Sequence, residues 1–579
     1  MRLLASLLLA SSLPASVSYR ISAPNPAPWR ELFGVFNLEE RAASPDLLIL
    51  EGDGEGFRAT QRRVTVRSVR DVIRPSLEIV WEKAVELPVY DLPAGDQVFT
   101  KERWTGAPLV AGLRRGGTIV LWTALSPGPH GYERFPYLMQ ALAELGFQPP
   151  YRGNRLWAFF DSGYRARADF DYLAARWRRA GIAGLHVAAW HYFDGDAAKS
   201  AELERLIDAC HRQRIAVYAW LELPHVSEKF WADHPEWREK TALGADAQLD
   251  WRKLMNLRDP ACNRAVTAGV RQLLQRFDWD GVNLAELYFE SLEGTANPAR
   301  FTPMNWLVRT EFKATHGWDP LDIFKGNHPA AEFLAWRSQL AAELQEQWLA
   351  ILRAIGRPLD IVCTHIDDRY DPRMRDLLGA DTQRTLQHLG HATLLIEDPA
   401  TVWNAGPRRY LDIAQKYGAD ARLAIDINIV ERYQDVYPTK QQTGGELFQL
   451  VHFAGQGFRR VAIYFENSIL APDYPLLSGA AAPKLQQGRT DRPYGVRFAG
   501  PALVNGKLWP VADGQTVWLP AGQHQVTQAA AAPRLRLLDL NAELLAASAT
   551  PDTTEFEYRS ASRAYALLAE APGVVEVNG

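Results

Sequence analysis

The chain of 579 residues carries 64 Lys and Arg against 68 Asp and Glu, a formal net charge of −4. Its length predicts three or four domains, because one domain usually holds about 100–200 residues. The 47% hydrophobic fraction excludes a mainly disordered or fibrous protein, and the near-neutral charge gives no reason to expect nucleic acid as a partner. The 19 Trp, 20 Tyr and 23 Phe stand out, since aromatic rings serve cores and also stack on sugar rings.

The first residues have the pattern of an export signal. Arg2 gives a positive start, an apolar stretch covers 3–13, and small residues follow between Ala15 and Ser18. Residues 1–19 are therefore expected to be a signal peptide of an exported protein, periplasmic or secreted; a buried N-terminal helix is the alternative. No later apolar run reaches the about 18–20 residues of a membrane span, so no integral membrane segment is expected.

Residues 20–152 are predicted to form a small α/β domain. Strands are expected at 47–50, 77–81 and 118–122, with helices at 108–115 and 135–146. The order of helix, Gly-Gly turn and strand across 108–122 resembles the flavodoxin-like fold of class I amidotransferases, which accompanies some glycosidase barrels. No cysteine lies in this region to act as an amidotransferase nucleophile. The resemblance therefore implies an accessory domain.

Residues 153–480 alternate apolar strands with amphipathic helical patterns. The strands are expected at 156–160, 184–190, 215–221, 281–287, 359–365, 392–396, 422–427 and 460–465. Eight strands, each followed by a helix, over about 250–350 residues are typical of a (β/α)8 TIM barrel. A doubly wound open sheet is the alternative, but no G-x-G-x-x-G follows a strand to favour it.

Residues 490–579 change character, with short alternating runs separated by turn residues such as Pro520-Ala521-Gly522. This pattern predicts a compact β-sandwich.

Polar and aromatic residues gather where the barrel strands are expected to end. In this fold the active site forms at the carboxyl ends of the strands, and side chains alternate between the two faces of each strand. The inward faces are predicted to end in Asp161, His186 with Trp190, Trp220 with Glu222, His365 with Asp367, Asp426 with Asn428, and Tyr464 with Glu466. The alternative is a polar plug, in which these side chains hydrogen-bond to one another and bind no ligand.

The approach to the fourth strand carries a recognisable series of motifs. It runs from His234-Pro235-Glu236-Trp237 through Asn256-Leu257-Arg258-Asp259-Pro260 to Asp280-Gly281-Val282. The series resembles the glycosyl hydrolases of the family-10-like group and, more loosely, the α-amylase superfamily barrels. The resemblance covers roughly 155–470 and is sharpest over 230–290. It implies a glycoside-hydrolase-like TIM barrel.

The sequence departs from related barrels at this strand. Where they often place a catalytic aspartate, this chain has Ala285, followed by Glu286. Strict alternation would put Glu286 with Val282 and Leu284 on the helix side. Glu286 reaches the pocket only if the strand ends or bulges there; otherwise it is a surface or salt-bridged acid.

Glycoside hydrolysis uses two carboxyl groups, about 5–5.5 Å apart in retaining enzymes and about 6.5–9.5 Å apart in inverting ones. One must hold its proton near neutral pH. The resemblance implies a pair across the barrel mouth, with Glu286 as general acid/base and Asp426 as nucleophile or base, although relatives usually carry Glu on strand seven. Glu397 and Glu466 are the substitutes. No cofactor is expected.

A carbohydrate substrate would also need binding residues around this pair. The expected stacking residues are Trp190, Trp220, Tyr288, Tyr370, Trp403 and Tyr464, and the expected hydrogen-bonding residues are Asp161, His191, Glu222, His365, Asp367 and Asn428.

Two other functions remain open. A metal-dependent polysaccharide deacetylase or amidohydrolase could use His186, His191, His365, Asp161 and Asp367 as ligands. However, the sequence has no H-x-H on the first strand, no H-x-x-E-H and no H-E-x-x-H. A non-catalytic barrel that binds a glycan in a polysaccharide or cell-envelope system is the third possibility, favoured by the missing acid at position 285.

Overall fold

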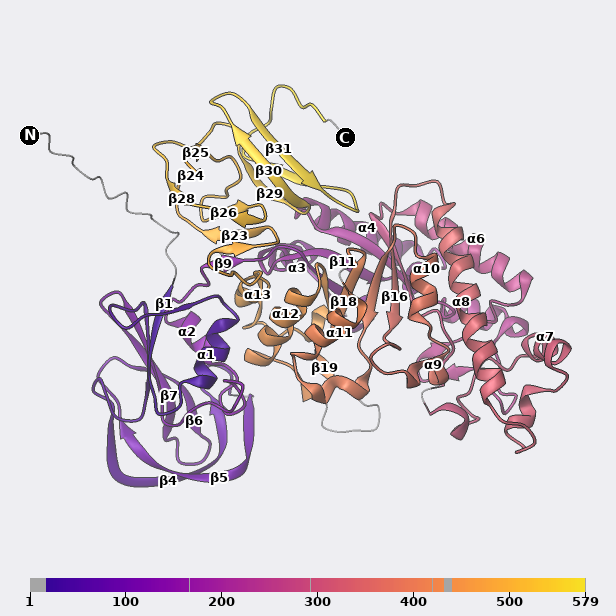
Figure 1. Cartoon of the computed structure of the whole chain (residues 1–579), viewed down its shortest axis with the longest axis horizontal. Helices are drawn as coiled ribbons and strands as arrows, with labels where there is room; N and C mark the ends of the chain where they lie inside the picture. Colours follow the sequence, from indigo (N-terminus) through magenta and orange to yellow (C-terminus); the bar gives the residue numbers. More distant parts are fainter. Residues whose placement is uncertain are drawn as a thin grey trace, which may run out of the picture.

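The computed structural model describes residues 17–577 except 76, 166, 292, 419 and 432–439. Figure 1 shows three parts in chain order: a sheet near the N-terminus, a large barrel with its helices, and a set of short strands near the C-terminus. No helix among the described residues is both long and apolar enough to cross a membrane.

The N-terminal part is an eight-stranded mixed sheet in the order β2-β1-β3-β8-β7-β6-β4-β5. Neighbours from β2 to β8 are parallel and the remaining pairs are antiparallel. The strands are β1 (Ser18–Ser22), β2 (Glu39–Glu40), β3 (Leu47–Glu51), β4 (Arg58–Asp71), β5 (Glu78–Asp91), β6 (Gln97–Glu102), β7 (Pro108–Arg115) and β8 (Thr118–Thr123), with helices α1 (Ala27–Gly34) and α2 (Leu138–Glu144).

The strands predicted at 47–50, 77–81 and 118–122 and the helix predicted at 135–146 are confirmed, but the helix predicted at 108–115 is wrong. That segment is β7, which pairs with β8 from Arg115 opposite Thr118. The reason is the two-residue Gly116-Gly117 connection, a strong hairpin signal between apolar runs. A flavodoxin-like fold needs helices between its parallel strands, whereas four antiparallel strands separate β3 from β8 here. The amidotransferase-like resemblance gains no support.

Residues 1–16 of the expected signal peptide lie outside the described residues. Ser18 and Tyr19, at the end of its expected range, belong to β1, where Tyr19 is buried and pairs with Leu47. A signal that ends at residue 19 would therefore remove part of the sheet.

The central part is a closed barrel of eight parallel strands, so the TIM-barrel prediction is confirmed. The strands are β10 (Leu156–Phe160), β11 (Ile182–Ala188), β12 (Ala216–Leu221), β15 (Gly281–Ala285), β16 (Asp360–Ile366), β17 (Thr393–Glu397), β18 (Leu423–Asn428) and β21 (Val461–Tyr464). All eight overlap the expected ranges.

Helices surround the barrel (Figure 1). They are α3 (Phe170–Arg179), α4 (Ala197–Arg212), α5 (Glu228–Asp233), α6 (Pro260–Arg276), α7 (Trp306–His316), α8 (Ala331–Arg353), α9 (Arg373–Leu378), α10 (Thr382–His388), α11 (Arg409–Tyr417), α12 (Gly445–Gly457) and α13 (Tyr474–Ala480). The loop between β12 and α6 also carries the small hairpin β13 (Gln248–Leu249) and β14 (Arg252–Lys253). A second hairpin, β19 (Val430–Glu431) and β20 (Lys440–Gln441), follows β18.

Side chains fill the barrel interior in alternation along each strand. Trp157 and Phe159 from β10 and Tyr218 and Trp220 from β12 pack there, as expected. The predicted inward face of the fifth strand is wrong. Val362 lies in the interior, whereas Cys363 packs in the core that the helices cover, which turns the Cys363–His365–Asp367 face outward. Both faces of a parallel barrel strand are apolar, so period two alone could not distinguish them.

The C-terminal part consists of short antiparallel strands around a small core that includes Val496, Val517 and Leu537. They form sheets of two or three strands, which supports the expected β domain and leaves its sandwich arrangement open. The strands are β9 (Tyr151–Arg152), β22 (Arg489–Thr490), β23 (Tyr494–Arg497), β24 (Ala502–Val504), β25 (Lys507–Leu508), β26 (Thr516–Leu519), β27 (Gly522–Gln523), β28 (Val526–Gln528), β29 (Leu537–Leu540), β30 (Glu543–Ala549), β31 (Thr554–Arg559) and β32 (Ala566–Leu568).

This C-terminal part is fastened to the amino end of the barrel. Asp539 on β29 pairs with Arg178 and Arg214, which precede β11 and β12, and Arg563 pairs with Asp278, which precedes β15. These ion pairs attach the C-terminal part to the amino end of the barrel. The carboxyl ends of the strands lie at the opposite end.

Candidate active site

Four carboxyl groups stand at the carboxyl ends of four barrel strands. Glu222 directly follows β12, Glu286 directly follows β15, Glu397 is the last residue of β17, and Asp426 lies in β18. Glu397 and Asp426 are direct neighbours in the ladder between their strands. We call Glu222, Glu286, Glu397 and Asp426 the acid cluster. All four were predicted from the sequence as site residues.

Glu286 reaches this cluster because its strand ends early. Ala285 is the last residue of β15 and packs inside the barrel. Glu286 then adopts φ +51°, in the left-handed region that non-glycine residues rarely occupy. The turn breaks the alternation that would have placed Glu286 with Val282 and Leu284 on the helix side. Its side chain remains 21% exposed, so it is accessible from the barrel mouth.

Arg252, on the hairpin β13–β14, lies against the acid cluster. Its Nε lies 3.2 Å from Glu222 Oε1, and its Nη1 lies 3.5 Å from Glu286 Oε2 and 3.3 Å from Glu290 Oε2. Sequence patterns did not single out Arg252 or Glu290, because neither stands at the end of a barrel strand. Three acids face this one buried guanidinium, so the negative charge is only partly compensated.

Burial raises the pKa of Glu222, Glu397 and Asp426 well above the usual carboxyl range. The charge of Glu286 raises all three further, after that of Asp398 in the case of Asp426. Burial also raises the pKa of Glu286, but the Arg252 guanidinium opposes that rise. Burial therefore favours the protonated form most strongly at Glu222, Glu397 and Asp426, and glycoside hydrolysis needs one such proton donor.

Several polar atoms of the site have no hydrogen-bond partner within the described part of the chain. They are Glu222 Oε2, Glu397 Oε2, Asp426 Oδ1 and Trp220 Nε1. Buried polar atoms normally find partners. Three acceptors and one donor left open at the same strand ends are what a polar ligand such as a sugar hydroxyl would complete.

Aromatic rings form a wall beside the acid cluster. The ring centroid of Trp220 lies 4.8 Å from that of Trp190 and 5.9 Å from that of Tyr464. Trp251, next to Arg252 on the hairpin, lies 5.4 Å from Trp190 and is 48% exposed. Trp190, Trp220 and Tyr464 were predicted, whereas Trp251 was missed because a hairpin of two-residue strands leaves no periodic signal.

Two tyrosine hydroxyls also face the acids. Burial raises the pKa of Tyr464 and Tyr288 well above the usual tyrosine value, and the charges of Glu286 and Glu397 add to the effect at both. At the rim of the wall, a 2.7 Å hydrogen bond joins His191 Nε2 to Asp161 Oδ1. Tyr288, His191 and Asp161 therefore lie near the cluster, as expected.

Glu466 does not belong to the acid cluster, so its prediction as a substitute acid is corrected. The side chain is fully buried, and Oε1 accepts hydrogen bonds of 2.8 Å from Trp177 Nε1 and from the Tyr474 hydroxyl. Its Oε2 is bonded to Arg165. Because both oxygens serve this network, Glu466 is a structural acid that ties α3 and α13 to the end of β21.

His365, Asp367 and Tyr370 turn away from the interior with the outward face of β16. Asp367 Oδ1 accepts hydrogen bonds from the Arg369 and Tyr370 amides and from the Tyr417 hydroxyl, and Lys416 Nζ lies 4.3 Å from the Tyr370 ring centroid. Asp367 and Tyr370 therefore support the loop and α11, and His365 Nδ1 is bonded to the Ile366 carbonyl at 2.8 Å. The predicted role of these three residues in sugar binding is corrected.

Two further predicted binding residues lie at the end of a strand or just after one. Asn428 Oδ1 accepts a hydrogen bond from the Val430 amide and so caps the end of β18. Trp403 is buried in the 3-10 segment Ala400–Ala405 after β17.

The residues considered for a metal are spread over the barrel. His186 lies in the interior, stacked on Tyr218, and burial lowers its pKa to about 3. His191 bonds to Asp161 at the mouth, and His365 faces outward. Among the described residues, no group of three or more His, Cys, Asp or Glu side chains could hold a metal ion.

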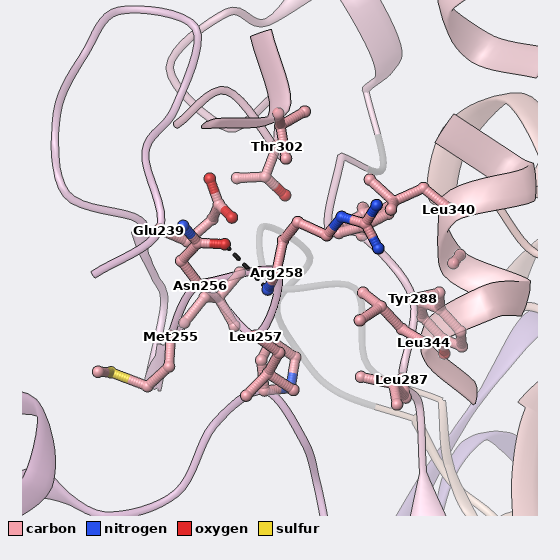
Figure 2. Close-up of a pocket in the computed structure, with 15 residues that line it drawn as sticks. Glu239, Met255, Asn256, Leu257, Arg258, Leu287, Tyr288, Thr302, Leu340 and Leu344 are labelled. Atoms are coloured by element: carbon pink, nitrogen blue, oxygen red, sulfur yellow. Dashed lines mark hydrogen bonds between the residues drawn. The ribbon is translucent and has the colours of Figure 1, made fainter. Parts of the chain in front are cut away.

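A pocket beside the barrel explains part of the motif series instead (Figure 2). Asn256, Leu257 and Arg258 line it together with Tyr288 and residues of α8. Asn256 Oδ1 accepts a hydrogen bond from the Arg258 amide, and Asp259 caps the N-terminus of α6. The N-L-x-D-P motif therefore shapes the approach to α6, and Tyr288 connects this pocket to the acid cluster.

No protein-family model matches the chain, and no curated protein matches it in sequence. Solved structures with similar folds include a β-galactosidase from the psychrophilic Marinomonas ef1 (11% identity, 56% of this chain and 59% of that chain, TM-score 0.42). Another is the PgaB (BpsB) glycoside hydrolase domain from Bordetella bronchiseptica, with 13% identity over 57% of this chain and 99% of that chain and a TM-score of 0.41. A third is a GH20 exo-β-N-acetylglucosaminidase from Vibrio harveyi, with 8% identity over 82% of this chain and 71% of that chain and a TM-score of 0.34.

The matched region spans about three-fifths of the Marinomonas enzyme. All three TM-scores lie below 0.5, so these likenesses carry no argument about activity, and the resemblance to the family-10-like group stays a prediction.

Proposed function

We propose that the protein is a glycoside hydrolase that acts on a poly- or oligosaccharide through paired carboxyl groups. The observation that carries the proposal is the acid cluster. Four inward carboxyls from separate strand ends have raised pKa values and oxygens without partners, beside an aromatic wall. Cleavage of a glycosidic bond needs one acid to protonate the leaving oxygen and a second to attack the anomeric carbon or activate water.

Glu286 and Asp426 are the proposed reacting pair, with Glu397 beside Asp426. Glu286 is the more accessible of the two, and Asp426 is almost fully buried. Trp251 would offer an exposed ring face to pyranose units, with the buried rings of Trp190 and Trp220 packed behind it. The Tyr464 hydroxyl and Trp220 Nε1 would bond sugar hydroxyls. The resemblance of the motif series to the family-10-like hydrolases points the same way.

The test is a screen of the purified protein against a panel of polysaccharides, with and without chelator. Glu286→Gln and Asp426→Asn are expected to abolish cleavage, and the exposed control Glu236→Gln is expected to leave it unchanged. Cleavage that survives both active-site substitutions would overturn the site assignment. Cleavage lost only with chelator would favour the metal-dependent alternative.

A non-catalytic glycan-binding barrel is the second candidate. Ala285 stands where related barrels often have an acid, and the aromatic wall would bind sugar without any chemistry. Glycan binding that persists in the wild-type protein while no panel member is cleaved would select this function.

We also propose that the protein is exported after removal of an N-terminal signal. Because β1 begins at Ser18, cleavage is expected before that residue. The N-terminal mass of the exported protein tests this.

A further inference from the structure

The charges of the acid cluster are unevenly distributed between two sides of the barrel mouth. On one side, Arg252 contacts Glu222, Glu286 and Glu290 within 3.2–3.5 Å and is itself only 9% exposed. On the other side, neither Glu397 nor Asp426 has an ion pair with any described residue. Arg409, which follows β17, is engaged by Asp398 at 2.6 Å. All the positive charge available to the cluster therefore lies on the side of Glu286.

Glu397 and Asp426 are also each other's neighbours. They sit opposite one another on adjacent strands, inside the same low-dielectric interior, and each retains an oxygen without a partner. Two adjacent buried carboxyls without a cation cannot both ionise, because each charge raises the cost of the other.

The remaining groups that face the cluster do not change this balance. Tyr288, Tyr464, Glu290, Asp398 and Asp161 are neutral or negative, and burial lowers the pKa of His225 to about 3, so it is neutral. Arg300 is bound to Asp250 and reaches only Glu290.

We propose that Arg252 is a positioning residue that divides the acid cluster into a side that ionises first, carrying Glu286, and a proton-holding side, the Glu397–Asp426 pair. The catalytic meaning of this division rests on the proposed function. It reverses the roles that the family resemblance implies, because Glu286 becomes the nucleophile or base and the proton donor comes from the opposite strands.

The bond changes balance without any further reactant. In a retaining route, Glu286 bonds to the anomeric carbon as the glycosidic C–O bond breaks, and the leaving oxygen takes the proton of the Glu397–Asp426 pair. Water then attacks the anomeric carbon, returns one proton to that pair and releases Glu286 as a carboxylate. In an inverting route, Glu286 removes the proton of the attacking water instead.

The location of the proton can be measured without a substrate, through thermal unfolding between pH 4 and pH 8. A buried acid with a raised pKa binds a proton on folding, so it destabilises the protein as pH rises from its unfolded pKa, about 4, through its folded pKa. Glu397→Gln cannot ionise. Its unfolding temperature is therefore expected to rise relative to wild type as pH increases. Arg252 opposes the rise that burial causes in the pKa of Glu286, so Glu286→Gln is expected to show a smaller rise than Glu397→Gln.

The unfolding temperature of Arg252→Gln is expected to fall more steeply with pH than that of wild type. Arg252→Lys keeps the positive charge and is expected to restore part of the difference. Lys253→Gln is the matched control on the same hairpin, because the one ion pair that Lys253 makes within the described residues is with the exposed Glu228. A relative rise with pH in Glu286→Gln and none in Glu397→Gln would overturn the proposal. So would identical profiles for Arg252→Gln and Lys253→Gln.

If the panel reveals a substrate, the pH profile of kcat/KM adds a second readout. The acidic limb reports ionisation of the base or nucleophile, and loss of a contacting cation is expected to move it upward by about one unit or more in Arg252→Gln. Lys253→Gln should leave it in place, and an unmoved limb in Arg252→Gln would count against the proposal. Absence of any hydrolysis would defeat the proposed function alone, because the unfolding profiles still locate the proton.

Discussion

The two ends of the barrel differ in whether their buried carboxyl groups have hydrogen-bond and ion-pair partners. At the amino end, Asp280 is fully buried, yet one oxygen accepts hydrogen bonds from His211 and the Val217 amide and the other accepts one from the Tyr565 hydroxyl. At the carboxyl end, acids outnumber cations and several oxygens have no partner among the described residues. The first arrangement stabilises the fold and the second stores unfavourable electrostatic energy, which is typical of a binding or catalytic site.

The largest expected effect is a loss of activity when an acid at the carboxyl end of the barrel is replaced. Glu286→Gln or Asp426→Asn should lower kcat by about 10²–10⁴-fold, the usual contribution of a positioned acid or base. Asp426→Asn should leave stability at neutral pH unchanged or higher, because it removes a buried acid whose pKa is raised. Kinetics and thermal unfolding of the same sample measure both. A strong loss of stability in Asp426→Asn would show that the two ends do not differ in this way.

The next effect belongs to the amino end. Burial alone would raise the pKa of Asp539, but its ion pairs with Arg178 and Arg214 bring it below its ordinary value. Asp539→Asn leaves the buried Arg178 guanidinium without its charge partner and should cost about 3–5 kcal/mol of unfolding free energy. Urea unfolding measures this, with Asp171→Asn as an exposed ion-pair control. Unchanged kcat in the folded variant would sharpen the contrast between the ends.

A smaller effect concerns the aromatic wall. Trp251→Ala removes an exposed ring that would cover a sugar, and burying a large apolar side chain contributes about 1.5–3 kcal/mol. The expected result is a KM about tenfold or more higher with kcat little changed. Trp306→Ala, an exposed tryptophan (71%) on α7, is the control. Equal KM values for the two variants would remove Trp251 from the site.

The smallest effect concerns Asp473, a buried acid that has hydrogen-bond partners but no ion pair with a residue that the structure describes. Asp473 accepts hydrogen bonds from the Gly444 amide and from Gln140, both neutral, and burial raises its pKa to about 6. The contribution of this carboxyl to stability is therefore fully present below about pH 4 and is lost as pH rises through 6. Asp473→Asn should therefore flatten the pH dependence of the unfolding temperature in this interval. An unaltered slope would mean that neutral partners suffice to hold this acid ionised.

The barrel was predictable because its eight strands are short, apolar and regularly separated by amphipathic helices. Glu222 and Asp426 followed from alternation along those strands. The inward position of Glu286 stayed open at the sequence level, because it depended on where the strand ends, and the structure ends β15 at Ala285. Where period two was ambiguous, as at Cys363 and His365, the wrong face was chosen. Glu466 looked like a strand-end acid, but its partner Trp177 comes from a helix 289 residues earlier in the chain. No local pattern reveals such contacts.

Arg252 and Trp251 were missed for a related reason. They occupy a hairpin with two-residue strands inside a long loop, and only the folded chain brings that hairpin over the strand ends. The predicted helix at 108–115 failed differently, since a Gly-Gly turn between apolar runs outweighed its helical appearance.

The left-handed backbone at Glu286 has an evolutionary consequence. Glycine and asparagine adopt that conformation at lower cost than glutamate, so the fold alone would favour replacing this residue. Relatives that have abandoned catalysis are therefore expected to carry Gly or Asn at the equivalent position with the barrel intact. A glutamate that persists there across relatives would mark selection for chemistry against the preference of the backbone.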